Sequence, residues 1–235
     1  IHAGLNSTEK SPSGMSGDDC DKLQKSKIKS ILGLTAQKMM IYALATSEQN
    51  LRMGTIVACP TAGSCGIVPA VLVAYSEDNN INENEQINAL ITAGEVGRLV
   101  ATKMALAGAV GGCQAECGVA SAMASAALTQ MMGGTVKQVI NSVALSLKNI
   151  LGLTCDPVCG LVEIPCVKRN PFLAIHAVTA SELAMANINS VIPIDEVVDA
   201  MEQTGQLMSP LLKESSQGGL AKTKTAVKFE KIFLK

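Results

Sequence analysis

The chain has 235 residues, a net charge of −1 and 48% apolar residues, enough for one domain with a buried core. The near balance of 19 basic and 20 acidic residues, with 2% aromatic residues, argues against nucleic-acid binding. The longest weakly polar run, residues 105–128, contains Gln114 and Glu116 and does not predict a membrane span. Without Trp, the core must be built from Ala, Leu, Ile, Val and Met, which favours closely packed helices.

The first half of the chain begins with a Ser-, Gly- and Asp-rich stretch. Residues 1–34 predict a surface lead-in, with a short helix over residues 16–29. A helix with apolar residues at helical spacing follows from Thr35, which can cap it. Residues 58–70, ACPTAGSCGIVPA, predict a rigid loop that opens into an apolar helix, and residues 84–106 predict a long helix.

The second half predicts four more helices. An Ala- and Met-rich helix is expected over residues 113–132, after glycines that interrupt the preceding helix and before a Gly-Gly pair. Helical spacing then recurs over residues 135–151, 170–187 and 194–212. The Lys-rich tail, residues 222–235, predicts a solvated or frayed end.

No strand alternation extends beyond a few residues, and no internal repeat is present. The expected fold class is therefore all-α, a compact bundle of about seven to nine helices around a site formed by Gly- and Pro-containing loops. Residues 35–221 form the expected helical domain, with residues 1–34 before it and residues 222–235 after it.

Histidine-based catalysis has few candidates, because only His2 and His176 are present and His176 lies in an apolar run that predicts a core position. A catalytic base would be a carboxylate, a lysine, a hydroxyl or a residue of another chain. Eight cysteines in a chain of this length, without an apolar signal segment, predict a reducing cytoplasmic environment rather than a disulfide scaffold.

The loop TAGSCG lacks the Gly-Lys-Ser/Thr ending of a phosphate loop. It offers backbone N–H groups and two hydroxyls where a helix begins, which is a suitable geometry for a small carboxylate. The expected substrate-binding residues are Thr61, Ala62, Gly63, Ser64 and Gly66.

The cysteines allow two metal hypotheses. The two C-x3-C pairs, Cys113 with Cys117 and Cys155 with Cys159, could form a four-cysteine zinc site, although Pro157 disfavours a helical second pair. The alternative takes one thiolate from each of three irregular positions: Cys113, Cys155 and Cys166. Three ligands to a 4Fe-4S cluster would leave one iron open as a Lewis acid. Spacing alone leaves both hypotheses open, together with a packing role for the thiols.

Four segments, ACPTAGSCGIVPAVL, GGCQAECGVASAM, LGLTCDPVCGLVEIPCVKRN and ESSQGGLA, together resemble the alpha subunit of the iron-sulfur-dependent L-serine dehydratases. The resemblance covers residues 39–221. It implies a 4Fe-4S cluster held by Cys113, Cys155 and Cys166 in an all-helical alpha domain. The implied reaction converts L-serine to pyruvate and ammonia without pyridoxal phosphate.

The resemblance also implies a partner. Single-chain members of the family carry a beta domain with a Ser- and His-containing loop that contributes substrate contacts and the base, so this chain is expected to act with a serine dehydratase beta subunit, in an oligomer. A C-terminal cysteine that caps the open iron in some relatives has no counterpart after Cys166. The same chemistry on L-cysteine or L-threonine, and a non-catalytic zinc-stabilised scaffold, are the alternatives.

Overall fold

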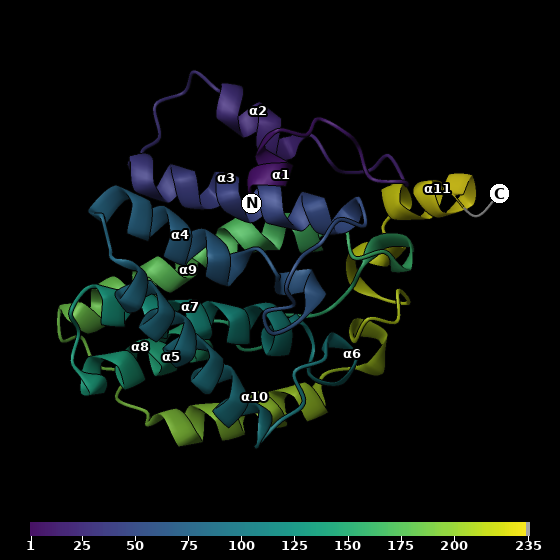
Figure 1. Cartoon of the computed structure of the whole chain (residues 1–235). Helices are drawn as coiled ribbons and strands as arrows, with labels where there is room; N and C mark the ends of the chain where they lie inside the picture. The colour runs from purple at the N-terminus through teal and green to yellow at the C-terminus, as the bar shows by residue number, and fades with distance from the viewer. Residues whose placement is uncertain (234–235) are drawn as a thin grey trace.

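The computed structural model describes residues 1–233, which contain α-helices, shorter helical turns and no β-strand (Figure 1). The predicted all-α bundle is confirmed, and nine of the described α-helices have seven residues or more. The described helices include none whose length and apolarity together would let it span a bilayer. In chain order the α-helices are α1 (His2–Leu5), α2 (Asp19–Lys25), α3 (Leu34–Leu51), α4 (Ile67–Asn79), α5 (Glu83–Ala101), α6 (Gly108–Gly111), α7 (Val119–Met131), α8 (Val136–Lys148), α9 (Cys166–Met185), α10 (Ile194–Leu207) and α11 (Lys224–Phe233).

Helix α7 lies in the middle of the bundle, and α4, α5, α8 and α9 pack around it (Figure 1). All residues from Val119 to Thr129 are buried, and five Ala and two Ser are among them. Small side chains let neighbouring helices approach closely, so a core without Trp can still pack densely. The two buried serine hydroxyls have acceptors: Ser121 Oγ donates to the Leu173 carbonyl oxygen of α9 at 3.0 Å, and Ser125 Oγ donates to the Ala122 carbonyl oxygen at 2.9 Å.

Several predicted helices are longer than the observed ones. The helices expected over residues 84–106 and 135–151 end at Ala101 and Lys148, and two further differences have a local cause. The helix expected over residues 16–29 is limited to α2, because the backbone of Ser26 is extended. The helix expected over residues 194–212 ends with α10, since Met208 is extended and Pro210 cannot donate to a continuing helix.

The helix expected over residues 113–132 is divided, because a π-helical turn, Gln114–Gly118, precedes α7. Helix α9 begins at Cys166, four residues earlier than expected, directly after Pro165. The tail, expected to be solvated or frayed, forms α11 up to Phe233 within the described residues, and most of its side chains there are exposed. Lys235 lies outside the described residues.

The N-terminal segment is less exposed than a surface lead-in. Helix α1 packs on α3, and the side chains of Ser11 and Ser16 are buried. The hydroxyls of Ser11 and Ser13 donate to a Glu163 carboxylate oxygen at 2.8 and 2.7 Å. The serines of this segment, which in the sequence indicate an exposed loop, therefore attach it to Glu163 in the loop that precedes α9.

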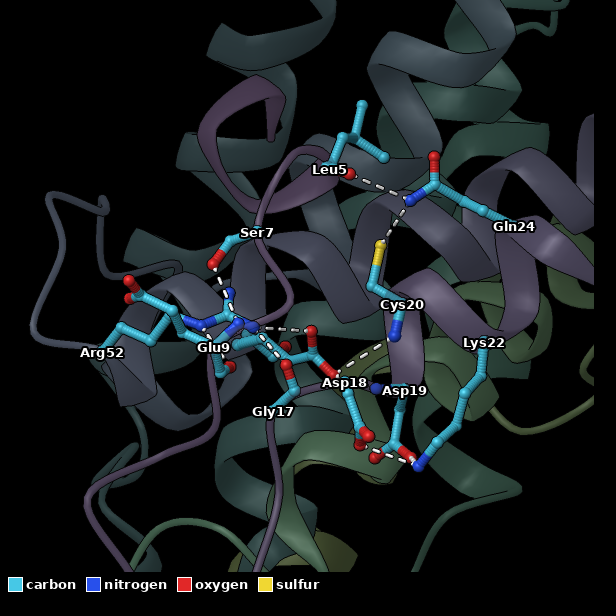
Figure 2. Close-up of polar contacts among 12 residues, drawn as sticks. Leu5, Ser7, Glu9, Gly17, Asp18, Asp19, Cys20, Lys22, Gln24 and Arg52 are labelled. Atoms are coloured by element: carbon cyan, nitrogen blue, oxygen red, sulfur yellow. Dashed lines mark hydrogen bonds and ion pairs between the residues drawn. The ribbon is translucent and has the colours of Figure 1, made fainter. Parts of the chain in front are cut away.

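A buried ion pair fastens α2 and the N-terminal segment to α3. Glu48 is fully buried, and its carboxylate accepts hydrogen bonds from the first two backbone N–H groups of α2 at 2.7 and 3.2 Å. Its other oxygen lies 3.2 Å from Arg52 Nη2. Figure 2 shows Arg52 beside Glu9 and Gly17, whose carbonyl oxygens accept from the guanidinium. One carboxylate thus offsets the dipole of α2 and neutralises the cation that ties down the segment before it.

The substitution Glu48→Ala should lower the free energy of unfolding by about 3–5 kcal/mol, because it leaves the Arg52 guanidinium buried without its partner. Denaturant unfolding followed by circular dichroism measures this change. Glu95→Ala, which removes the partner of exposed Arg98, is the matched control and should unfold close to the parent. Equal midpoints for the two variants would contradict the role of the buried pair.

Candidate functional site

Three segments that are distant in the sequence meet near the start of α7: the turn after α6, the loop of residues 152–165 and the first turn of α9. They bring Cys113, Cys155 and Cys166 together, with 2%, 3% and 7% of their surfaces exposed. All three are free thiols, and their sulfurs interact electrostatically with one another. The structure thus collects the three cysteines that irregular backbone had singled out in the sequence.

Gln114, the residue after Cys113, joins two of these segments. Its backbone N–H donates to the Leu153 carbonyl oxygen at 3.0 Å, and its side-chain oxygen accepts from the Gly152 N–H at 2.9 Å. Its side-chain nitrogen donates to the Met201 carbonyl oxygen of α10 at 2.9 Å. The side chain is fully buried, so these bonds replace all contact with water and fix the turn that carries Cys113.

The late segment that follows α10 closes over the loop that carries Cys155. The Cys155 N–H donates to the Leu212 carbonyl oxygen at 2.9 Å, and the Glu214 N–H donates to the Cys155 carbonyl oxygen at 2.6 Å. The next residue, Asp156, accepts from the Leu220 N–H at 2.8 Å. The ESSQGGLA motif therefore provides the backbone bonds that Cys155 and its loop would otherwise lack.

Two glycines leave space that a side chain would fill. A Cβ on Gly108 would lie 2.9 Å from Cys155 Sγ and 2.5 Å from a Glu116 carboxylate oxygen. Gly112 has a φ of +77°, and a Cβ there would lie 2.7 Å from Met208 Sδ. Only glycine allows the backbone to approach these neighbouring atoms so closely. The two glycines therefore leave a narrow space beside the thiols.

The three thiols differ in how readily they ionise. Burial, with a smaller contribution from Cys113, raises the pKa of Cys166 to about 12, and burial also raises the pKa of Cys155. The neighbouring Cys117 thiol lowers the pKa of Cys113, and the positive charge of Arg169 lowers it further. Collecting several thiolates in such a dry place requires a compensating positive charge from the protein or from a metal.

The second members of the two C-x3-C pairs have different surroundings. Cys117 is buried, and the neighbouring Cys113 thiol together with burial raises its pKa. Cys159 is half-buried in a left-handed conformation with φ of 57°, and its charged neighbours are Glu230 and Glu163 rather than the other thiols. Among the described residues, no three His, Cys, Asp or Glu side chains are grouped closely enough to hold one metal ion. Cys159 therefore does not lie with the other three members of the pairs, as a four-cysteine zinc site would require.

The loop predicted to bind a carboxylate, residues 61–66, is attached to α9 one turn after Cys166. The Gly66 N–H donates to Asn170 Oδ1, and Asn170 Nδ2 donates to the Gly63 carbonyl oxygen, both at 2.9 Å. Asn170 is fully buried, so its amide has no competing water. This single side chain holds the glycine loop next to the cysteines.

The groups of this loop do not all face outward. Ser64 is fully buried, and its hydroxyl lies 3.2 Å from the Cys59 carbonyl oxygen and 3.1 Å from Thr61 Oγ1. Ala62 is exposed, and the N–H groups of Ala62 and Gly63 begin a short 3-10 turn in which the first N–H groups have no acceptor within the turn. The loop thus uses Ser64 to keep its shape.

Glu116 is a functional candidate that the sequence analysis missed. Its carboxylate is near the Thr61 hydroxyl and the Gly108 N–H, and it lies 3.9 Å from Cys155 Sγ. Burial raises the pKa of this carboxyl group. In an Ala-rich run a lone Glu suggests an exposed position, but the π-helical turn directs Glu116 into the site; its place three residues after Cys113 was the available signal.

His176 is held as predicted for a packed histidine. Its Nε2 lies 2.9 Å from the Ser146 carbonyl oxygen of α8, which gives the half-buried ring a hydrogen-bond partner. Of the other cysteines, Cys20 and Cys65 are buried and Cys59 is half-buried, in keeping with packing positions.

Comparison with known proteins gives one consistent result. Residues 1–221 match the family model of the serine dehydratase alpha chain. The chain is 49% identical over 223 residues to a probable L-serine dehydratase alpha chain of Bacillus subtilis, covering 94% of this chain and 74% of the relative. It is 48% identical over 207 residues to the L-serine dehydratase alpha chain of Peptoniphilus asaccharolyticus, covering 88% and 71%. It is 43% identical over 183 residues to L-serine dehydratase TdcG of Escherichia coli, covering 77% of this chain and 40% of the relative. The chain belongs to the serine dehydratase alpha chain family.

Proposed function

We propose that this chain is the alpha subunit of an iron-sulfur L-serine dehydratase, which converts L-serine to pyruvate and ammonia. The observation that carries the proposal is the meeting of three buried free thiols beside one cationic and one acidic side chain. The names of the relatives, L-serine dehydratase alpha chains, support L-serine over L-cysteine and L-threonine as the substrate. Eight free thiols support a reducing compartment, the cytoplasm.

The donor set fits a 4Fe-4S cluster held by Cys113, Cys155 and Cys166. The ligands of one zinc ion would need sulfurs about 3.8 Å apart, as follows from tetrahedral bonds of about 2.3 Å, whereas three thiolates on separate irons of a cluster stand further apart. The missing Cβ of Gly108 keeps space beside Cys155 Sγ. When bound, such a cluster supplies an open iron that acts as a Lewis acid toward the substrate hydroxyl.

The loop of residues 61–66 is the proposed site for the substrate carboxylate. The N–H groups of Ala62 and Gly63 and the hydroxyl of Thr61 offer donors, while Ser64 and Gly66 hold the loop in place through their own hydrogen bonds. Since Thr61 also approaches Glu116 beside Cys155, a carboxylate bound at this loop would lie next to the thiols. The loop would then orient the rest of a small amino acid toward the cluster.

Abstraction of the α-proton needs a base, and we assign it to a beta subunit. The match to the E. coli L-serine dehydratase TdcG covers 40% of that relative. The other part of the relative is not matched by this chain. The imidazole of His176 is committed to the Ser146 carbonyl oxygen of α8. This chain's part is to hold the cluster, the carboxylate and the acidic Glu116 in one place.

Substituting any one of Cys113, Cys155 and Cys166 by Ser should lower bound iron and sulfide by about tenfold or more, because a hydroxyl is a far poorer ligand for iron in a cluster. The measurement is iron and acid-labile sulfide per chain after anaerobic reconstitution with the partner subunit. Cys159→Ser is the matched control, from the same loop, and should keep the parent's content. Equal losses at Cys159 and Cys155, with zinc as the bound metal, would favour the scaffold alternative instead.

Thr61→Val should raise the KM for L-serine about tenfold, because the substrate carboxylate loses one charge-assisted hydrogen bond. Iron content should stay at the parent's level, since Thr61 is not a proposed ligand. Thr102→Val, whose hydroxyl donates to the Leu99 carbonyl oxygen at the end of α5, is the control for loss of a hydroxyl elsewhere. An unchanged KM would remove the loop from the substrate site.

The chain without its partner should take up iron and sulfide yet form no detectable pyruvate from L-serine, because the base belongs to the beta subunit. Coupled assays with lactate dehydrogenase, run with and without the beta chain, test this. Turnover by the chain alone would show that the base is among its own residues.

A further inference from the structure

A buried arginine connects two of the segments that carry the thiols. Arg169 is in the first turn of α9, three residues after Cys166, and its side chain is 13% exposed. Nη1 donates to the Thr154 carbonyl oxygen at 2.8 Å, and Nη2 donates to Asp156 Oδ1 at 3.1 Å. Both acceptors flank Cys155, so the guanidinium crosses from the segment of Cys166 to that of Cys155.

The same guanidinium faces Cys113. Two of its five N–H groups are used by the bonds to Thr154 and Asp156, which leaves donors for other acceptors in the fixed plane of the fork. The positive charge of Arg169 lowers the pKa of Cys113, so the guanidinium lies close to this sulfur. One side chain therefore contacts or borders all three segments that carry the thiols.

The orientation of Arg169 depends on Asp156. Asp156 is 5% exposed, and its second carboxylate oxygen accepts from the Leu220 N–H at 2.8 Å. A Cβ on Gly219, which has a φ of +58°, would lie 2.4 Å from that oxygen, so only glycine allows the late segment to come this close. The carboxylate is thus held from one side, and it holds the arginine on the other.

We propose that Arg169 is a positioning residue for the iron-sulfur cluster, which donates an N–H group to the Cys113 sulfur and offsets the negative charge of the three thiolates. The inference rests on the proposed function. Three thiolates in a buried site repel one another, and a cation that cannot lose its proton lowers this cost. Hydrogen bonds to ligand sulfurs also shift the reduction potential of a cluster.

Lysine would be a poor replacement for this arginine. A guanidinium binds the Thr154 carbonyl and the Asp156 carboxylate at once and keeps further donors for the proposed bond to Cys113, because its N–H groups point outward in one plane. An ammonium is a point charge on a flexible stem. The Arg169→Lys variant keeps the charge and loses the fork. It separates the hydrogen-bonding role from the mere presence of a cation.

The test uses the full chain with its partner subunit, reconstituted anaerobically, as parent, Arg169→Lys and Arg169→Gln. Iron loss to a chelator should be about 10–100 times faster in both variants than in the parent, with the larger effect in Arg169→Gln. The reduction potential of the cluster that remains should shift as well, which a merely structural role would not produce. Arg98→Lys, on the exposed face of α5, is the matched control and should keep the parent's rate.

Each outcome separates the two proposals. If both variants bind the cluster, lose iron at the parent's rate and show the parent's reduction potential, the role of Arg169 is overturned. The proposed function is unaffected by that result. A parent that takes up no iron and sulfide overturns the proposed function, and the role of Arg169 with it. Thermal unfolding of the metal-free variants identifies a loss of fold, and Arg169→Lys with a parent-like midpoint but rapid iron loss supports the proposal.

Discussion

The site depends on one buried amide, the side chain of Gln114. Its two hydrogen bonds, to Gly152 and to Met201 of α10, hold the π-helical turn against the start of the cysteine loop. An amide that is sealed from water cannot exchange these partners for solvent, so losing one leaves a buried polar group unpaired. The positions of Cys113 and Cys155 relative to each other follow from this constraint, although neither thiol takes part in it.

Helical periodicity and glycine punctuation were sufficient to predict the bundle, because α8 and α10 carry strong one-sided apolar patterns and α7 is a continuous Ala-rich apolar run before a Gly-Gly pair. Glycine and proline marked Cys113, Cys155 and Cys166 as lying at irregular backbone, but their spacing left a four-cysteine zinc site and simple packing open as well. The π-helical turn of residues 114–118 could not be predicted, because its extra residue leaves no mark on a pattern of Ala and Gly. Glu116 was missed for this reason.

Hydrogen bonds between segments that are distant in the sequence also could not be predicted from it. The sequence ESSQGGLA does not predict that the Glu214 N–H donates to the Cys155 carbonyl oxygen or that the Leu220 N–H donates to Asp156. Likewise, Ser64 was expected to face a ligand because hydroxyls in glycine loops often do, but it is committed to Cys59 and Thr61 inside the loop. Such choices depend on which neighbour offers an acceptor, and that is decided by the tertiary fold.

The closure of Cys155 by residues 212–214 has a consequence for the order of events during protein synthesis. A ribosome that has just added Cys166 has made all three thiols, yet the carbonyl of Leu212 and the N–H of Glu214 that hold the Cys155 backbone do not exist. Until they emerge, the thiols belong to a loop without its partners, open to oxidants and to stray metal ions. Under the proposed function, the backbone of the Cys155 ligand is therefore held in place only after the chain has grown past Glu214.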